Sequence, residues 1–318
     1  MQKFLAIALL AVALAPVSAF ALGPVVYNVP PDPLPSLLLP GDILNYDPGA
    51  NLYDNLTAPA GTTVNLFSGF VDFPNYVEGN LNLLGGSVST PLFARDASVS
   101  LGLNSTLSDA ALQRSQLDIV GGEVLVQLSA TDSLVNMSEG AINVLGSIPG
   151  TTINMTGGRI GTAFLPVTGA GGVLNVSGGK LGFFRIADGV QLNMSGGTIE
   201  VFPWPSAFLA APGSSVHLIV QSASIDGVAI PGLALGGTFE LDVTNRIGEL
   251  TGLLRDGSPF HFHLAKGRSN AALNGPMIVT APTPTVGKIS ILLTQVPEPA
   301  SALLAATISA PLVRRRFR

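Results

Sequence analysis

The chain has 318 residues, including 37 Gly and 24 Pro, with 47% hydrophobic and only 11% charged side chains. It is too apolar for a disordered protein and too poor in Lys and Glu for a helical bundle, so we expect an all-β fold of short strands joined by Gly-rich turns. Without Cys it can form neither disulfides nor thiolate metal sites, and the net charge of −10 over residues 22–299 (10 basic and 20 acidic side chains) argues against a nucleic-acid partner.

Residues 1–21 have the pattern of a secretory signal peptide. Lys3 is followed by an apolar run over residues 4–14, and Ala19 and Ala21 each end a small-residue cleavage pattern. The run is short for a membrane span of roughly 20 residues, which disfavours a retained anchor. We therefore expect the protein to be secreted.

Residues 22–44 are rich in proline and predict an extended N-terminal segment that leads into the main body. An imperfect first coil or an N-terminal cap is expected at residues 44–56. The prolines of the extended segment are Pro24, Pro30, Pro31, Pro33, Pro35 and Pro40.

Residues 45–223 contain an eight-residue element that recurs at a nearly constant interval. Clear copies begin Leu-Asn-Val-Ser-Gly-Gly at residue 174 and Leu-Asn-Met-Ser-Gly-Gly at residue 192. A period near 18 residues is too short for a helix–turn–helix repeat and suits one coil of a parallel β-helix, or β-solenoid. At a strand spacing of about 4.8 Å, about nine coils make a rod of about 40 Å. The copies start at positions 64, 81, 99, 117, 135, 153, 174, 192 and 216.

Each position of the element has an expected place in the coil. The apolar first and third positions face the core, and the polar residues between them point away from it. The Gly-Gly pair permits a sharp corner with positive φ. Stacked copies would also align a structural ladder of side-chain amides, hydrogen-bonded from coil to coil as in cross-β stacks. Its members are Asn65, Asn82, Asp118, Asn136, Asn154, Asn175 and Asn193.

Turns and insertions also follow the repeat. Asp96, Asp132 and Gly150 each lie three residues before a copy of the element and predict a turn there. Longer coils predict loops at residues 168–172 and 202–205, on a face that often binds ligands in solenoids. Trp204, the only Trp, is interpreted as a cap over the coil end, with a sugar-stacking platform as the alternative.

Residues 224–295 lose the period but keep the β character, which predicts a β-rich capping module. Asp226-Gly227 and Asp256-Gly257 lie between apolar runs and are typical of hairpin turns. Such a module would cover the open edge of the solenoid, which otherwise invites aggregation. Strands are expected near residues 238–244, 252–254, 260–264, 276–279 and 288–293.

Residues 296–318 resemble the PEP-CTERM sorting signal of bacterial surface proteins. The signal consists of a Pro-Glu-Pro motif, a short apolar helix, a basic cluster and the chain end; here Pro311 interrupts the apolar stretch. The resemblance implies transient membrane insertion and recognition by an exosortase-type transpeptidase. A C-terminal anchor that is never processed is the alternative. The matching residues are Val296, Pro297, Glu298, Pro299, Arg314, Arg315 and Arg316.

The Asn-x-Ser-Gly-Gly coils and residues 251–260 resemble the autotransporter-like β-helix repeats of repetitive PEP-CTERM surface proteins. This similarity covers most of residues 45–301. It implies an architecture and a location at the bacterial cell surface, the outer membrane or the extracellular matrix. It implies no particular activity.

Candidate metal ligands are few. His261 and His263 lie two residues apart on one face of an expected strand, and only Asp256 or His217 offers a further ligand. A metal site needs a third or fourth ligand. We therefore interpret this strand face as merely polar and predict neither a metal nor a cofactor.

An enzyme is the remaining rival, because polysaccharide lyases use parallel β-helices. The acidic residues Asp118, Glu123, Asp132 and Glu139 fall at different coil positions, and no Gly-x-Ser-x-Gly nucleophile elbow is present. We therefore predict no catalytic residue and a non-catalytic structural protein of the cell surface or matrix. A carbohydrate-binding adhesin, with extracellular polysaccharide as partner, is the alternative, and a β-helix lyase or hydrolase is less favoured.

Overall fold

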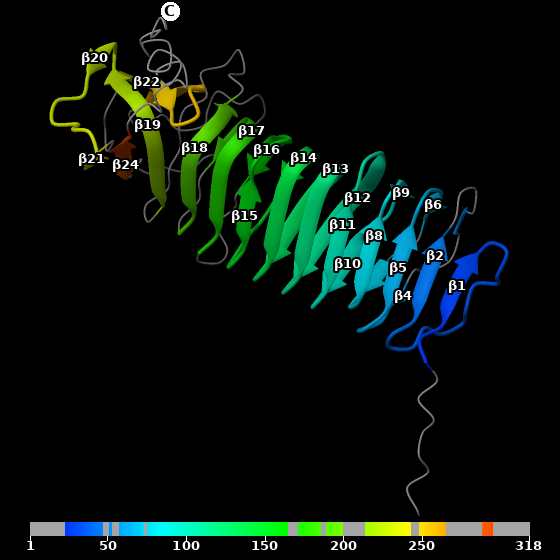
Figure 1. Cartoon of the computed structure of the whole chain (residues 1–318). Helices are drawn as coiled ribbons and strands as arrows, with labels where there is room; N and C mark the ends of the chain where they lie inside the picture. The colour runs from blue at the N-terminus through cyan, green and yellow to red at the C-terminus, as the bar shows by residue number, and fades with distance from the viewer. Residues whose placement is uncertain are drawn as a thin grey trace, which may run out of the picture.

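The computed structural model describes residues 23–46, 51–52, 57–72, 75–164, 171–185, 189–199, 214–242, 248–264 and 288–294. In these ranges the secondary structure is β only, and no helix is long and apolar enough to cross a membrane. The strands stack one beyond another into an elongated rod that runs from β1 to a group of strands around β19 (Figure 1). The predicted signal peptide, Trp204 and the sorting residues lie outside the described residues.

Three parallel sheets form the sides of the rod. Sheet 1 joins the strands that contain the repeated element. Its strands are β1 (Val26–Val29), β2 (Ile43–Tyr46), β5 (Thr63–Leu66), β8 (Asn80–Leu83), β11 (Ser98–Leu101) and β15 (Thr152–Met155), with the first residues of β13 (Gln116–Thr131), β14 (Leu134–Leu145), β17 (Val173–Arg185), β18 (Gln191–Ile199) and β19 (Ser215–Ile225).

Sheets 2 and 3 follow in each coil after a corner. Sheet 2 contains β3 (Asn51–Leu52), β6 (Phe70–Val71), β9 (Gly86–Val88) and the start of β12 (Ser105–Gln113) and of β16 (Arg159–Phe164). Sheet 3 contains β4 (Thr57–Ala58), β7 (Asn75–Val77), β10 (Leu92–Arg95) and the end of β12. The long strands β13, β14 and β17 bend through the corners, so their later residues extend the same two sheets.

The register confirms the predicted solenoid. The first residue of the element occupies one column through all nine predicted copies, from Val64 to Val216. Alternate residues are buried in the strand segments that contain the repeated element, so the apolar first and third positions fill the core, with Leu117 and Ile119 fully buried. Because each coil adds one rung to the same columns, the core is continuous along the rod.

The N-terminal segment differs from its prediction as an extended lead-in over residues 22–44. β1 and β2 are rungs of sheet 1, with Asn28 and Asn45 in register with Asn65. Prolines flank β1 without occupying it, so its ladder hydrogen bonds are kept. The buried Asp42 carboxylate accepts the backbone N–H groups of Val25 (2.9 Å) and Leu39 (2.8 Å), which fixes the turn before β2. The solenoid therefore begins at Val26.

The two glycines of the repeated element have different tasks, as residues 178 and 179 show. Gly179 has φ of +83°, which confirms the predicted corner. Gly178 has an ordinary φ, but a Cβ there would collide with the carbonyl oxygen of Thr156 in the preceding coil. Glycine at residue 178 thus allows close approach between coils, whereas glycine at residue 179 allows the turn as well as a close approach, because a Cβ there would also meet backbone atoms of Gly157 and Gly158.

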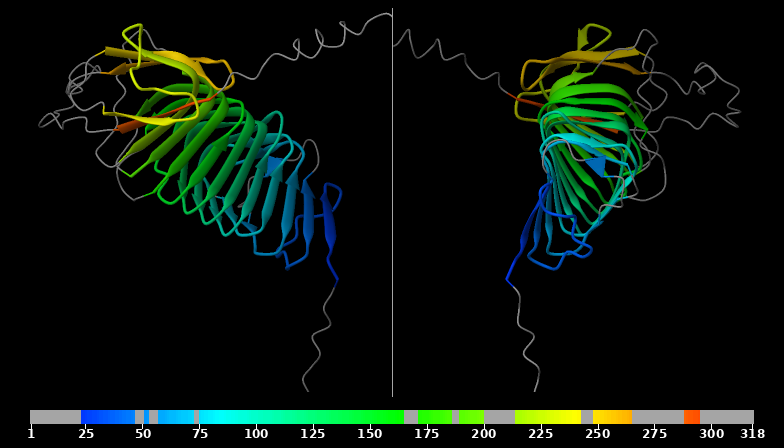
Figure 2. Two further views of the ribbon diagram at one scale, coloured as in Figure 1. Left: turned by 60° about the vertical axis from the view of Figure 1, so that its left-hand side comes forward. Right: turned by 90° about the vertical axis from the view of Figure 1, so that its right-hand side faces the viewer.

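The C-terminal strands end the parallel stack. β24 (Lys288–Leu293) pairs parallel with β19 as one more rung, and β21 (Thr238–Asp242) pairs antiparallel with β24. β20 (Val228–Ala229) and β22 (Gly248–Leu254) pair antiparallel with β19, and β23 (Pro259–Leu264) pairs with β22. The turns at 226–227 and 256–257 connect hairpins as predicted. Figure 2 shows these strands gathered at one end of the stacked coils.

Candidate functional site

The seven residues predicted for the amide ladder lie in one column on the outer side of sheet 1. Each asparagine side chain donates from Nδ2 to Oδ1 of the coil before it, as Asn154 does to Asn136 at 3.0 Å. The other distances within this ladder are 2.7–2.8 Å. Asn28 and Asn45, which the sequence analysis did not include, extend the column at its N-terminal end.

Ser100 interrupts the column and divides it into two ladders. The register places Ser100 between Asn82 and Asp118. Asp118 begins the second ladder, and its carboxylate accepts from Asn136 and from Gln116, two residues before it on the same strand. A carboxylate suits this position, because it accepts hydrogen bonds and has no donor to satisfy on its other side. The ladder is therefore directional, with an acceptor at its start.

The corner between sheets 3 and 1 is lined by residues with positive φ. Asp96 (51°), Arg114 (48°), Asp132 (49°) and Gly150 (63°) occupy corresponding turn positions in four successive coils. Turns were predicted from the sequence at Asp96, Asp132 and Gly150, but not at Arg114. The Arg114 guanidinium donates to both Asp96 carboxylate oxygens at 2.7 Å and holds the pKa of that carboxyl below its usual value.

A column of hydroxyl side chains lies directly beneath this corner. Ser115 Oγ accepts the Ala97 N–H, Ser133 Oγ accepts the Ser115 N–H and Thr151 Oγ1 accepts the Ser133 N–H, at 3.1–3.2 Å. Both serine hydroxyls also donate to a backbone carbonyl two residues earlier. This column was not predicted from the sequence, although a small or hydroxyl residue recurs immediately after each turn residue. These groups satisfy buried N–H donors and so have a structural role.

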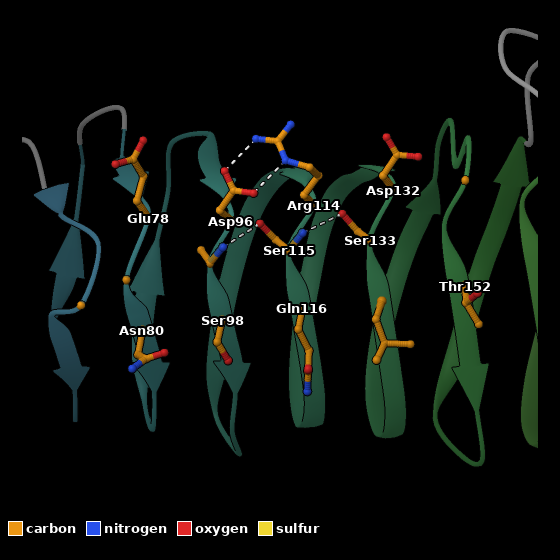
Figure 3. Close-up of a pocket in the computed structure, with 15 residues that line it drawn as sticks. Glu78, Asn80, Asp96, Ser98, Arg114, Ser115, Gln116, Asp132, Ser133 and Thr152 are labelled. Atoms are coloured by element: carbon orange, nitrogen blue, oxygen red, sulfur yellow. Dashed lines mark hydrogen bonds and ion pairs between the residues drawn. The ribbon is translucent and has the colours of Figure 1, made fainter.

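A shallow polar groove of about 690 Å³ runs across the coils at the same corner. One wall is the row of turn residues, and the other is the first outward position of sheet 1, as Figure 3 shows. Polar groups therefore follow one another along the groove at the strand spacing of about 4.8 Å. They are amides, hydroxyls, carboxylates and the guanidinium of Arg114. Its side chains include Glu78, Asp96, Arg114 and Asp132 on the first wall, and Asn80, Ser98, Gln116 and Thr152 on the second.

The acidic residues considered for a lyase occupy separate columns. Asp118 belongs to the amide ladder, and Asp132 belongs to the turn row. Glu123 lies on sheet 2, in register with Thr106 and Ala141. Glu139 lies at the corner between sheets 1 and 2, where it pairs with Val120. The structure thus does not bring these four carboxylates into one column.

His217 lies apart from the other two histidines, His261 and His263, which are both on β23. His217 takes the amide-column position of β19, in register with Asn193. His261 lies on β23, with its Nε2 3.5 Å from a carboxylate oxygen of Glu249 on β22. Within the part of the chain that the structure describes, no group of three or more His, Asp or Glu residues could hold a metal ion.

The predicted sorting residues Val296, Pro297, Glu298, Pro299, Arg314, Arg315 and Arg316 lie outside the described residues. Comparisons of the chain with protein-family models, with curated proteins and with solved structures find no match in any of the three.

Proposed function

We propose that this protein is a secreted structural component of the bacterial cell surface or extracellular matrix, with the solenoid as a non-catalytic rod. The observation that carries the proposal is the use of the repeated polar side chains. The asparagines of sheet 1 bond to one another from coil to coil, and the buried hydroxyls of the corner bond to backbone groups. Side chains engaged in this way stabilise the rod and are not directed at a substrate.

The location rests on the two ends of the sequence. The signal-peptide pattern supports export, and the resemblance of residues 296–318 to a PEP-CTERM signal supports sorting by an exosortase-type transpeptidase. The basic cluster would remain on the cytoplasmic side, which leaves the Pro-Glu-Pro motif at the outer side. A rod held by packing and hydrogen bonds, with no disulfide to form, does not depend on the redox state of its surroundings.

Expression in a bacterium that has an exosortase-type enzyme, and in its deletion strain, tests the proposal. We expect surface protease to reach the body of the full chain in the parent strain, and mass spectrometry to show a C-terminus near Pro299. In the deletion strain the basic tail should remain attached. The Glu298→Ala variant should behave like the deletion, whereas Gln295→Ala, just before the motif, should be processed normally. A body that stays inside the parent strain would contradict the proposal.

A carbohydrate-binding adhesin is the second candidate function. The groove favours it, because hydroxyls, amides, carboxylates and a guanidinium are suited to a polyhydroxylated ligand, and the groove extends over several coils. A polymer with a regular repeat could contact equivalent groups on successive coils. Retention of the full chain on immobilised polysaccharide would support this function, and its absence would leave the purely structural role.

A further inference from the structure

Two exposed aromatic rings are stacked beside the groove. Tyr76 on β7 and Phe93 on β10 are in register on sheet 3, with ring centroids 5.4 Å apart and an interplanar angle of 18°. Tyr76 is 57% exposed and Phe93 is 41% exposed. Aromatic side chains with their apolar surface in water are suited to a ligand that has an apolar face and polar edges.

The stack is open on the side of the following coils. The column that contains Tyr76 and Phe93 continues with Ala111 on β12 and Ser129 on β13. One face of the Phe93 ring contacts Tyr76, and the other face points toward Ala111 and Ser129. The side chains of Ala111 and Ser129 are too short to cover that second face. The result is an aromatic shelf, formed by Phe93 above Ala111, of the kind on which a flat ring can continue the stack.

The aromatic shelf and the groove form one surface around the corner. Two residues beyond Tyr76 and Ala111 along the chain lie Glu78, just after the end of β7, and the exposed Gln113, the last residue of β12, each about 7 Å further along the strand direction. Glu78 also lines the groove, as do Asp96 and Arg114 in the following coils. An apolar platform is thereby joined to a row of hydrogen-bonding groups.

We propose that this surface binds a neutral polysaccharide, with one sugar ring stacked on Phe93 over Ala111 and the chain continuing into the groove. The inference rests on the adhesin candidate and identifies its ligand class and site. Sugar rings have C–H faces that pack on aromatic rings and hydroxyl edges that bond to carboxylates, amides and guanidinium groups. A neutral polymer fits the charge, since residues 22–299 carry a net charge of −10 and three carboxylates line the groove.

Affinity electrophoresis of the purified full chain tests this site. The gels contain hydroxyethyl cellulose, dextran or polygalacturonate, all at 0.15 M salt. We expect retardation by at least one neutral polymer and none by polygalacturonate. Phe93→Ala should weaken the affinity at least fivefold because it removes the platform. Ala111→Leu should do the same because it covers the platform without removing it.

Two control variants separate binding from folding. Tyr76→Phe preserves the stacked ring and should bind as the original chain does. Leu103→Ala removes an apolar side chain that is 62% exposed, but at a turn after sheet 1, and should also leave binding unchanged. Unchanged thermal unfolding of all four variants would show that the rod is intact.

The possible failures are distinguishable. If the original chain binds a neutral polymer and both Phe93→Ala and Ala111→Leu bind equally well, the site is wrong but the adhesin function stands. If the original chain binds none of the three polymers, the adhesin function and the site both fail. Retardation by polygalacturonate alone would overturn the choice of a neutral ligand.

Discussion

The Nδ2 group of Asn136 donates to the Asp118 carboxylate at 2.8 Å, and this contact begins the second amide ladder of the rod. At the other end of the ladder, Asn193 donates to Asn175, and its own Oδ1 accepts from Gln191 on the same strand. Both terminal residues thus have a glutamine partner two residues earlier. Between them, every asparagine is a donor to one coil and an acceptor from the next.

This direction predicts an asymmetry between two exchanges of Asn and Asp. Asn154→Asp places a carboxylate opposite Asn136 Oδ1, where a donor is needed, and should lower the free energy of unfolding by about 1–3 kcal/mol at pH 7. Asp118→Asn keeps an acceptor for Asn136 and should cost less than about 1 kcal/mol. Urea unfolding measures both. Equal losses for the two variants would contradict a directional ladder.

The two tasks of glycine can be separated by substitution. Gly178→Ala puts a Cβ against the Thr156 carbonyl oxygen of the preceding coil and should cost about 1–3 kcal/mol through overpacking. Gly171 has φ of +95° but open space around its Cβ position, so Gly171→Ala should cost only the backbone strain of about 1–2 kcal/mol. The Gly178 variant should also weaken the pairing of β17, which contains residue 178, with β15 in the preceding coil. This would be seen as lost amide exchange protection in β15. Normal protection there would argue against steric contact between coils.

The hydroxyl column predicts a penalty for one small change. Ser133→Ala removes the acceptor of the Ser115 N–H and should reduce the free energy of unfolding by about 1–3 kcal/mol. Ala97→Ser is the matched control, because it adds a hydroxyl at the equivalent position of the column. The N–H that this hydroxyl would accept, that of Gly79 one coil earlier, already bonds to the Ala58 carbonyl. That reverse change should leave stability nearly unaltered. A neutral Ser133→Ala variant would show that the hydroxyl is dispensable.

Asp256 joins the cap to the last Gly-Gly corner and makes stability depend on pH. Its carboxylate accepts the Gly197 N–H at 2.9 Å and both the N–H and the hydroxyl of Ser258. Burial by itself raises the pKa of this carboxyl, but the hydrogen bonds from Ser258 and Gly197 outweigh it and leave the pKa below its ordinary value. The stabilisation is therefore present above about pH 4 and is lost as the pH falls through the folded-state pKa.

Asp256→Asn tests this linkage. The stability difference between the original chain and this variant should be constant at neutral pH and should shrink below about pH 4, in thermal unfolding followed from pH 7 to pH 2. Ser258→Ala, which keeps the carboxyl and removes one hydroxyl donor, should show a smaller difference in the same pH range. A difference that does not change with pH would mean that the carboxylate charge has no part in holding the cap.

The nearly constant repeat length made the solenoid predictable from the sequence. Individual contacts were predictable only where the same residue type recurs at the same position of the repeat. Asn154 and Asn175 recur with one residue type at one position, so their alignment could be read from the sequence. Asn28 and Asn45 belong to the same column but lack the Gly-Gly sequence that marks the element, and the prolines around them suggested an extended chain. The solenoid was therefore predicted to begin too late.

The groove and the aromatic shelf were not predictable in the same way. Arg114 adopts a positive φ that is rare for arginine, so nothing in its type marks it as a turn residue. Tyr76 and Phe93 lie outside the repeated element and meet only because their strands are in register. Both features depend on the third side of the coil, where the sequence repeats in length but not in residue type.

The distance between labels on different coils tests the stacked architecture most directly. Asn80 and Gln191 occupy the same column of sheet 1, six coils apart through Ser98, Gln116, Leu134, Thr152 and Val173. Spin labels on cysteines at these two positions should be about 29 Å apart, and labels at 80 and 152 about 19 Å apart, at about 4.8 Å per coil. Double electron–electron resonance should give both distances as narrow distributions. Distances that do not increase with the number of intervening coils would contradict the solenoid and the function inferred from it.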